Sequence, residues 1–175
     1  MKASQVQYSL SLSLPPNWGV TTPALLNELD GEAGDSLKAM LSSLNGFDFL
    51  EEASTLDPQP LISWLSVPIP SPDNGGQAIG SISAWILVAI LMSPGDAFVP
   101  DEILDIDGKL IKKKSVTQNY NYAGKVDFEY FQVQYQMTLA PNVEIYVNAQ
   151  SPDILLKDFF EVIFDEIVST LNVES

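Results

Sequence analysis

Histidine, cysteine and arginine are all missing from this chain of 175 residues. Without cysteine and histidine there can be no disulfide framework, no zinc–cysteine cluster and no nucleophile activated by histidine. Without arginine as well, phosphoryl and acyl transfer lose their usual charge-stabilising groups. The sequence therefore predicts a protein that is not an enzyme, with no catalytic residue, no metal site and no cofactor.

Positive charge and long apolar runs are also scarce. Eight lysines face 23 acidic residues, which gives a net charge of −15 and disfavours nucleic acid as a partner. The most apolar run, residues 84–92, is far shorter than the roughly 20 residues that span a bilayer. Residues 5–14 alternate polar and apolar, unlike a signal peptide. We expect a cytoplasmic protein with no stable membrane insertion.

Apolar residues are abundant: 46% of the chain is hydrophobic and only 18% is charged, so a sizeable core is expected. The length and the absence of a linker or repeat predict a single domain over residues 1–175.

Several segments have the two-residue period of β-strands. In residues 6–14 apolar side chains alternate with serine and glutamine, which predicts a half-buried strand. Residues 61–69 and 81–92 predict two strands joined by a turn-rich stretch. The second is apolar on both faces, as in the centre of a covered sheet; a buried helix is the alternative.

The second half of the chain adds further strands. Asp107 and Gly108 lie between short apolar runs and predict a tight hairpin. In residues 126–139 the apolar alternation changes phase at Tyr130 and Phe131, which predicts a β-bulge there. A last strand is expected over residues 143–149.

Helices are expected near both ends. Thr22 and Pro23 predict the start of a short helix over residues 24–29, and a second piece is expected over residues 35–44. Ser151 and Pro152 predict a long C-terminal helix over residues 152–171. Phe160, Ile163 and Ile167 should face the sheet. The opposite side should be a narrow polar line of Lys157, Glu161, Asp165 and Ser169.

Together these elements predict an α+β fold. An antiparallel β-sheet of six or seven strands should be flanked by helical segments on both faces, as in an α/β/α sandwich.

Both ends of the chain resemble the PsbP-like superfamily, the fold shared by a photosystem subunit and a Ran-binding nuclear-transport factor. The likeness lies in the opening residues 8–18, with Pro15 and Trp18 at a corner, and in the closing residues 143–171. It implies a sandwich fold and a protein that acts by binding, like the adaptors and secretion chaperones of that superfamily. It implies no functional residue.

The densest acidic cluster is Asp101, Glu102, Asp105 and Asp107. Such a cluster could bind Ca²⁺, but the spacing does not fit an EF-hand, and a solvated hairpin edge is the favoured interpretation. The lysines at 109, 112, 113 and 114 could contact an anionic group; a charged edge strand that pairs with these acids is favoured.

Tyr120, Tyr122 and Tyr146 are the aromatic candidates for contact with a partner. With the four acids they form the predicted partner-binding set. The predicted function is a non-catalytic adaptor, chaperone or immunity-type inhibitor that recognises a basic or amphipathic protein segment; a homodimer is compatible with it. The alternative is a carrier of a small apolar ligand, held between the sheet and the C-terminal helix.

Overall fold

The computed structural model describes residues 9–26, 55, 59–65, 84–92, 99–122, 126–141, 143–151 and 154–174. The strands are β1 (Ser9–Ser11), β2 (Trp18–Thr21), β3 (Leu61–Leu65), β4 (Ala84–Met92), β5 (Glu102–Ile106), β6 (Lys109–Tyr122), β7 (Val126–Ala140), β8 (Val143–Ser151) and β9 (Asn172–Glu174). The helical elements are α1 (Pro23–Leu26), the 3₁₀ turn η2 (Ile154–Leu156) and α4 (Lys157–Ser169).

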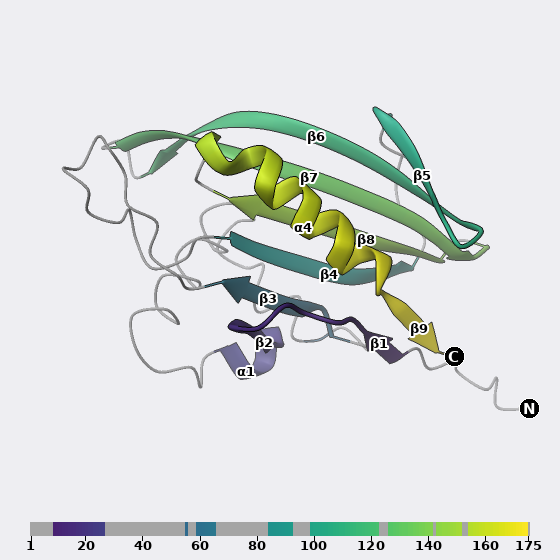
Figure 1. Cartoon of the computed structure of the whole chain (residues 1–175). Coiled ribbons are helices and arrows are strands. Elements are labelled where there is room, and N and C mark those ends of the chain that lie inside the picture. Colours follow the sequence, from purple (N-terminus) through teal and green to yellow (C-terminus); the bar gives the residue numbers. More distant parts are fainter. Residues whose placement is uncertain are drawn as a thin grey trace, which may run out of the picture.

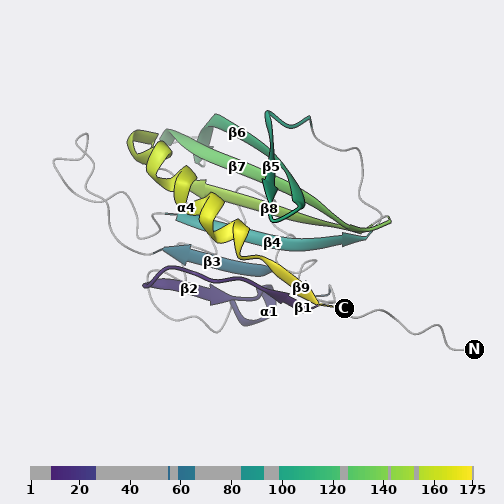
Figure 2. The same cartoon turned by 45° about the vertical axis from the view of Figure 1, so that its right-hand side comes forward.

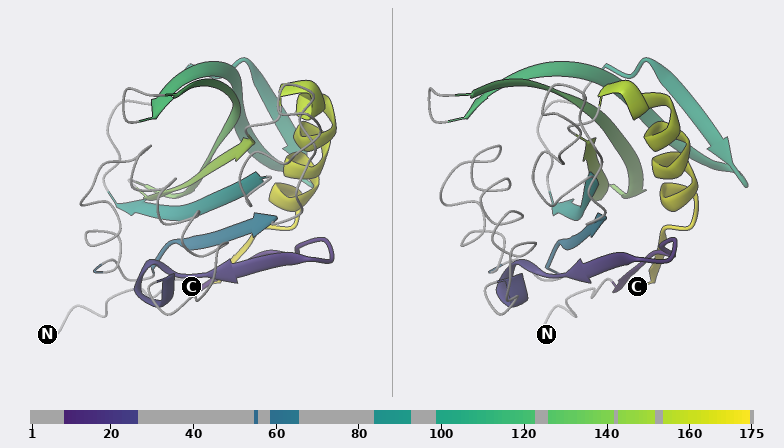
Figure 3. Two further views of the ribbon diagram at one scale, coloured as in Figure 1. Left: turned by 90° about the vertical axis from the view of Figure 1, so that its left-hand side faces the viewer. Right: turned by 60° about the vertical axis from the view of Figure 1, so that its left-hand side comes forward.

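Seven of these strands form one antiparallel sheet in the order β2-β3-β4-β8-β7-β6-β5. Figure 1 shows α4 lying across one face of it, and Figure 3 shows that β6 and β7 are strongly bent. The short strands β1 and β9 form a separate pair (Figure 2). The predicted α+β fold with an antiparallel sheet is thus confirmed.

The strand that the sequence predicts at the centre of the sheet, β4, has that position in the structure. β4 pairs with β3 on one side and β8 on the other, and its residues 84–90 are buried. The alternative of a buried helix is wrong. Trp64 and Trp85 lie directly opposite each other in the β3–β4 pair. Burial on both faces explains why this strand carries almost no polar side chain.

The β5–β6 hairpin turns where the sequence predicts it. Asp107 and Gly108 have φ of 52° and 83°, the left-handed region that glycine adopts at no steric cost. The Asp105 carboxylate accepts a hydrogen bond from the Gly108 N–H at 3.0 Å. Turn chemistry therefore fixes this hairpin locally.

The β-bulge predicted at Tyr130 and Phe131 is wrong. The β6–β7 register runs without a shift from Lys112↔Gln136 to Tyr122↔Val126, and the irregularity of β7 lies against β8, between Thr138 and Ala140. Tyr130 and Phe131 are both buried although they face opposite sides of the sheet. Because both faces of the sheet are covered at this point, apolar side chains can follow each other at consecutive positions without a bulge.

The N-terminal region agrees in part. Leu10, Leu12 and Leu14 pack against the core while the serines between them are exposed, as the alternation predicts, but the strand is only three residues long. The sequence did not indicate β2. Its Gly19 lies opposite Trp64, and a Cβ there would overlap the indole ring, so glycine is required. α1 begins at Pro23 as predicted; the helix expected over residues 35–44 lies outside the described residues.

The start of the C-terminal helix differs from the prediction. Ser151 is the last residue of β8 and is fully buried, and the first helical residue that the structure describes is Ile154. The helical segment begins as the 3₁₀ turn, and α4 follows with Leu156 at its N-cap and no capping side chain. Residues 152–153 lie outside the described part of the chain. After α4 the chain forms β9, which the sequence did not indicate.

The main hydrophobic core lies between the sheet and α4. Alternate residues of β4, β7 and β8 supply one side, and Phe160, Phe164, Ile167 and Val168 supply the other. Phe164 stacks near both Phe131 and Phe160, at ring distances of 6.4 and 6.0 Å. Ile163, predicted to be buried, is only half-buried.

Candidate functional site

The outward face of the C-terminal helix is apolar. Leu155, Phe159 and Val162 are 82%, 57% and 58% exposed, and their i, i+4, i+7 spacing places them in one row. We call these three residues the apolar row. Asp158 and Glu166, also exposed, lie one helical turn before and after Val162. The row is therefore an exposed apolar strip with carboxylates beside it.

The predicted polar line of the helix does not face away from the sheet. Glu161 and Asp165 turn towards Lys113 of β6, which is only 4% exposed. The Lys113 ammonium lies 2.7 Å from a Glu161 oxygen and 2.8 Å from an Asp165 oxygen. A buried ammonium needs opposite charges, so these acids belong to the helix–sheet interface. This leaves the apolar row as the outward face.

Tyr135 of β7 completes this group. Its hydroxyl donates a hydrogen bond of 2.6 Å to Asp165, and its side chain is buried. Burial, together with this hydrogen bond and the nearby carboxylates, raises the pKa of Tyr135 well above its usual range. Burial alone would lower the pKa of Lys113, but the hydrogen bonds and charges of Asp165 and Glu161 outweigh it and raise that pKa.

These pKa directions predict a loss of stability in alkali. The folded protein keeps the Tyr135 proton, while the unfolded chain releases it near the ordinary tyrosine pKa of 10.0. The unfolded state then binds fewer protons, so the stabilisation is complete below pH 10 and declines as the pH rises above it. Between pH 9 and 11, Tyr135→Phe should lessen the fall in the free energy of unfolding by about 1.4 kcal/mol in total, because one proton per molecule is released only well above pH 10. Urea unfolding between pH 9 and 11 measures it; an unchanged fall would contradict the assignment.

Two of the four sequence-predicted acids join this group. Asp101 accepts a hydrogen bond from the Ser115 N–H at 3.1 Å, and the Ser115 hydroxyl donates to Glu161 at 3.2 Å. Glu102 lies opposite Lys113 in the β5–β6 register. Carboxylates from β5 and α4 therefore gather on one side of the helix, beside the apolar row.

The other two acids lie apart. Asp105 and Asp107 belong to the hairpin turn, where Asp105 holds the backbone. Among the residues that the structure describes, no group of three or more acidic side chains is arranged to hold a metal ion.

The run of lysines is divided by the strand alternation. Lys113 faces α4, whereas Lys112 and Lys114 face the other side of the sheet. The predicted charged edge strand is wrong for β6, because β5 pairs with it and is itself the last strand of the sheet. Within the described residues, the ion-pair partners of Lys113 are Glu161 and Asp165 of α4, not the preceding acidic cluster.

The three candidate tyrosines do not form one site. Tyr146 of β8 is half-buried on the face opposite α4, where its hydroxyl accepts a hydrogen bond of 2.9 Å from Gln134. Its register row contains Gln136 and Lys112, and Tyr120 lies eight residues further along β6, about 26 Å when followed along the strand. Of Tyr120 and Tyr122 the structure describes only the backbone, at the end of β6. Their role in partner binding stays a prediction.

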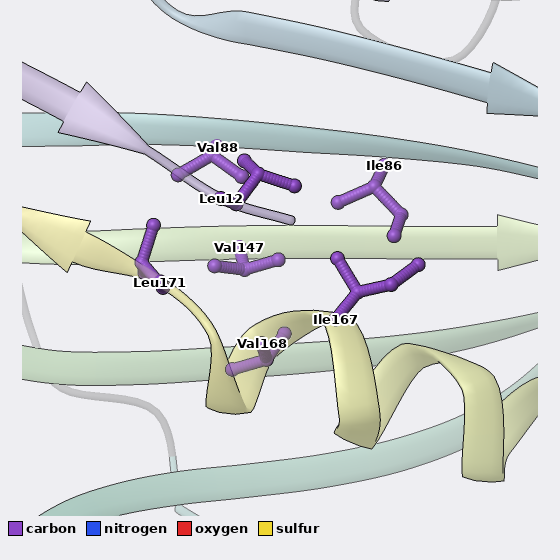
Figure 4. Close-up of a pocket in the computed structure, with 7 residues that line it drawn as sticks. All are labelled: Leu12, Ile86, Val88, Val147, Ile167, Val168 and Leu171. Atoms are coloured by element: carbon purple, nitrogen blue, oxygen red, sulfur yellow. The ribbon is translucent and has the colours of Figure 1, made fainter. Parts of the chain in front are cut away.

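Little space is available for the ligand of the carrier alternative. The gap between the sheet and α4 offers no volume that even a water molecule could occupy, and it is lined by apolar residues (Figure 4): Leu12, Ile86, Val88, Val147, Ile167, Val168 and Leu171. Small-molecule sites usually measure about 300–1,000 Å³. The described part of the helix–sheet interface therefore favours packing over carriage of a ligand.

No protein-family model, curated protein or solved structure matches the chain. The resemblance to the PsbP-like superfamily accordingly stays a prediction. Within the described residues, no helix is long and apolar enough to cross a membrane.

The sequence analysis missed the apolar row because α4 is apolar on most of its circumference. Asp158 and Glu166 flank Val162 at i±4, which is typical of an outward face. Glu161 and Asp165 have the same spacing and lie at the helix–sheet interface, so the position of carboxylates along the helix does not identify the outward face.

Proposed function

We propose that the protein is a non-catalytic protein-binding domain, of the adaptor, secretion-chaperone or immunity-protein type, that recognises a basic and amphipathic segment of another protein. The observation that carries this proposal is the apolar row on η2 and α4, formed by Leu155, Phe159 and Val162 and bordered by carboxylates. Contiguous exposed apolar side chains with a polar rim are typical of protein–protein contact surfaces.

The charge around the row defines the partner. Asp158 and Glu166 lie beside the row on the same helix, and Asp101 and Glu102 lie on the other side of the Lys113 group. A partner helix with leucine-type side chains on one side and lysine or arginine at its margins would bury the row and pair with these acids. The net charge of −15 would also speed its approach, an effect that salt screens.

The resemblance at the two ends of the chain agrees with this proposal, since members of the PsbP-like superfamily act by binding. The composition agrees as well, because histidine and cysteine, two common catalytic nucleophiles and bases, are missing from the sequence.

A designed peptide tests the proposal. The probe has leucine at i, i+3, i+4 and i+7 and lysine elsewhere, and a second peptide carries glutamate in place of lysine. The lysine peptide should bind the wild-type protein, more weakly as salt is raised, and the glutamate peptide should not. Replacing Phe159 and Val162 by glutamine should weaken binding at least about tenfold, as loss of central apolar contacts does. Isothermal titration calorimetry measures all three affinities.

Val20 and Leu25 provide the matched control. They are 56% and 50% exposed and lie on β2 and α1, at the other edge of the sheet from β5 and its acids. The variant Val20→Gln, Leu25→Gln should bind the lysine peptide like the wild type. Equal loss in both double variants, or equal binding by the α4 variant and the wild type, would show that the apolar row is not the contact surface.

A further inference from the structure

The face of the sheet opposite α4 has a polar centre that the protein-binding proposal does not use. Two register rows cross β6, β7 and β8: Lys112, Gln136 and Tyr146 form one, and Lys114, Gln134 and Asn148 form the other. Glu144 lies two residues before Tyr146 on the same face. We call Lys112, Lys114, Gln134, Gln136, Glu144 and Tyr146 the lysine–amide patch.

Lys112 and Lys114 supply unpaired positive charge. Both are half-buried, and within the described part of the chain neither ammonium makes an ion pair or a hydrogen bond. They are two residues apart on one strand, so their Cβ atoms are about 7 Å apart on the same side. Lys113 between them has two carboxylates. Although acidic residues outnumber lysines by 23 to 8 in the sequence, the described part of the chain places no acid against these two neighbouring ammonium groups.

Gln136 and Glu144 supply acceptors that are buried and unused. Among the residues that the structure describes, the side-chain oxygen Oε1 of Gln136, a residue only 8% exposed, has no hydrogen-bond partner, and neither has the buried Oε2 of Glu144. Buried acceptors are satisfied in the great majority of cases, because leaving one unpaired is costly. The two residues are diagonal neighbours on β7 and β8, about 7–8 Å apart.

Tyr146 lies between these groups as a donor. Burial raises the pKa of its phenol, which therefore keeps its hydrogen, while its oxygen accepts from Gln134. The patch thus has ammonium groups over β6, and oxygen acceptors beside a hydroxyl over β7 and β8. The distance across two strand spacings, from β6 to β8, is about 10 Å.

From these features we propose that the lysine–amide patch binds a small hydroxylated anion, of the sugar phosphate or sugar acid class. The phosphate or carboxylate lies between Lys112 and Lys114, and ligand hydroxyls donate to Gln136 and Glu144. A monosaccharide that carries one anionic group has the length to span the two ends. A longer polyanion is repelled by the net charge of −15, whereas one anionic group needs only the two ammonium groups.

Thermal unfolding and calorimetry with four probes test the site: glucose 6-phosphate, gluconate, glucose and inorganic phosphate. At least one hydroxylated anion should bind saturably and raise the Tm, and glucose and inorganic phosphate should bind at least about tenfold more weakly. Lys112→Met with Lys114→Met should abolish binding. The control Lys157→Met removes an exposed lysine of α4 and should change nothing.

A second variant separates binding from folding. Gln136→Met removes the unpaired acceptor, so it should raise the Tm of the free protein by about 2–4 °C. It should also weaken binding of the hydroxylated anion at least about tenfold. A lower Tm would mean that the Gln136 oxygen already has a structural partner, and would overturn the proposal. Three other outcomes would also overturn the proposal. Neither hydroxylated anion binds, or both bind the double lysine variant as tightly as the wild type, or inorganic phosphate binds as tightly as the hydroxylated anions.

Discussion

Replacing Phe160 by alanine is expected to lower the free energy of unfolding by about 3–5 kcal/mol, the usual cost of truncating a buried phenylalanine. The side chain is 1% exposed and stacks near Phe164 at the centre of the helix–sheet core. Its loss removes apolar burial and leaves a cavity that α4, fixed by the Lys113 ion pairs, can close only in part. Urea unfolding followed by circular dichroism measures the change.

The adjacent Phe159 is the matched control. It is 57% exposed and contacts Phe160 edge-on at 5.4 Å, so Phe159→Ala should lose no more than about 1.5 kcal/mol. If the two variants unfold with the same free energy, α4 does not pack against the sheet by the face described.

Asp165→Ala is expected to cost about 3 kcal/mol, the lower end of the range for removing one partner of a buried ion pair. The substitution leaves the Lys113 ammonium with Glu161 alone and the Tyr135 hydroxyl without its acceptor. Chemical denaturation of the variant at neutral pH gives the value.

A triple variant separates the cost of an unpaired charge from the net value of the group. Lys113→Met with Glu161→Gln and Asp165→Asn removes all three charges together, and should be more stable than Asp165→Ala because no buried charge lacks a partner. A triple variant less stable than Asp165→Ala would mean that the ion pairs themselves stabilise the fold by more than their desolvation cost.

Local patterns predicted much of the sheet. The alternation of residues 10–14, the apolar run of β4 and the Asp107–Gly108 turn each depend on neighbours in sequence, and each is present in the structure. The bulge at Tyr130 was predicted from the same kind of alternation and was wrong. Alternation of apolar and polar residues shows which face of the sheet a side chain occupies only where one face is exposed to solvent.

The site was less predictable because it depends on contacts distant in sequence. Lys113 meets Asp165 across 52 residues, and the sequence does not indicate which of many acids pairs with a lysine. When the ion pairs with Lys113 are not known, the sequence suggests that Glu161 and Asp165 face solvent and that Phe159 is buried. The lysine–amide patch likewise follows from the register of β6, β7 and β8, which the sequence did not specify.

The pairing of β1 with β9 has a consequence for the folding pathway. Ser13 and Thr170, which hydrogen-bond beside this pair, are 157 positions apart, whereas β5 to β8 follow one another through short turns. Loop-closure entropy favours the local hairpins first, so the meander should form early and the two end strands should meet late. Mutations in β1 or β9 should then accelerate unfolding while leaving the refolding rate nearly unchanged, and a slowed refolding rate in stopped-flow experiments would reverse this order.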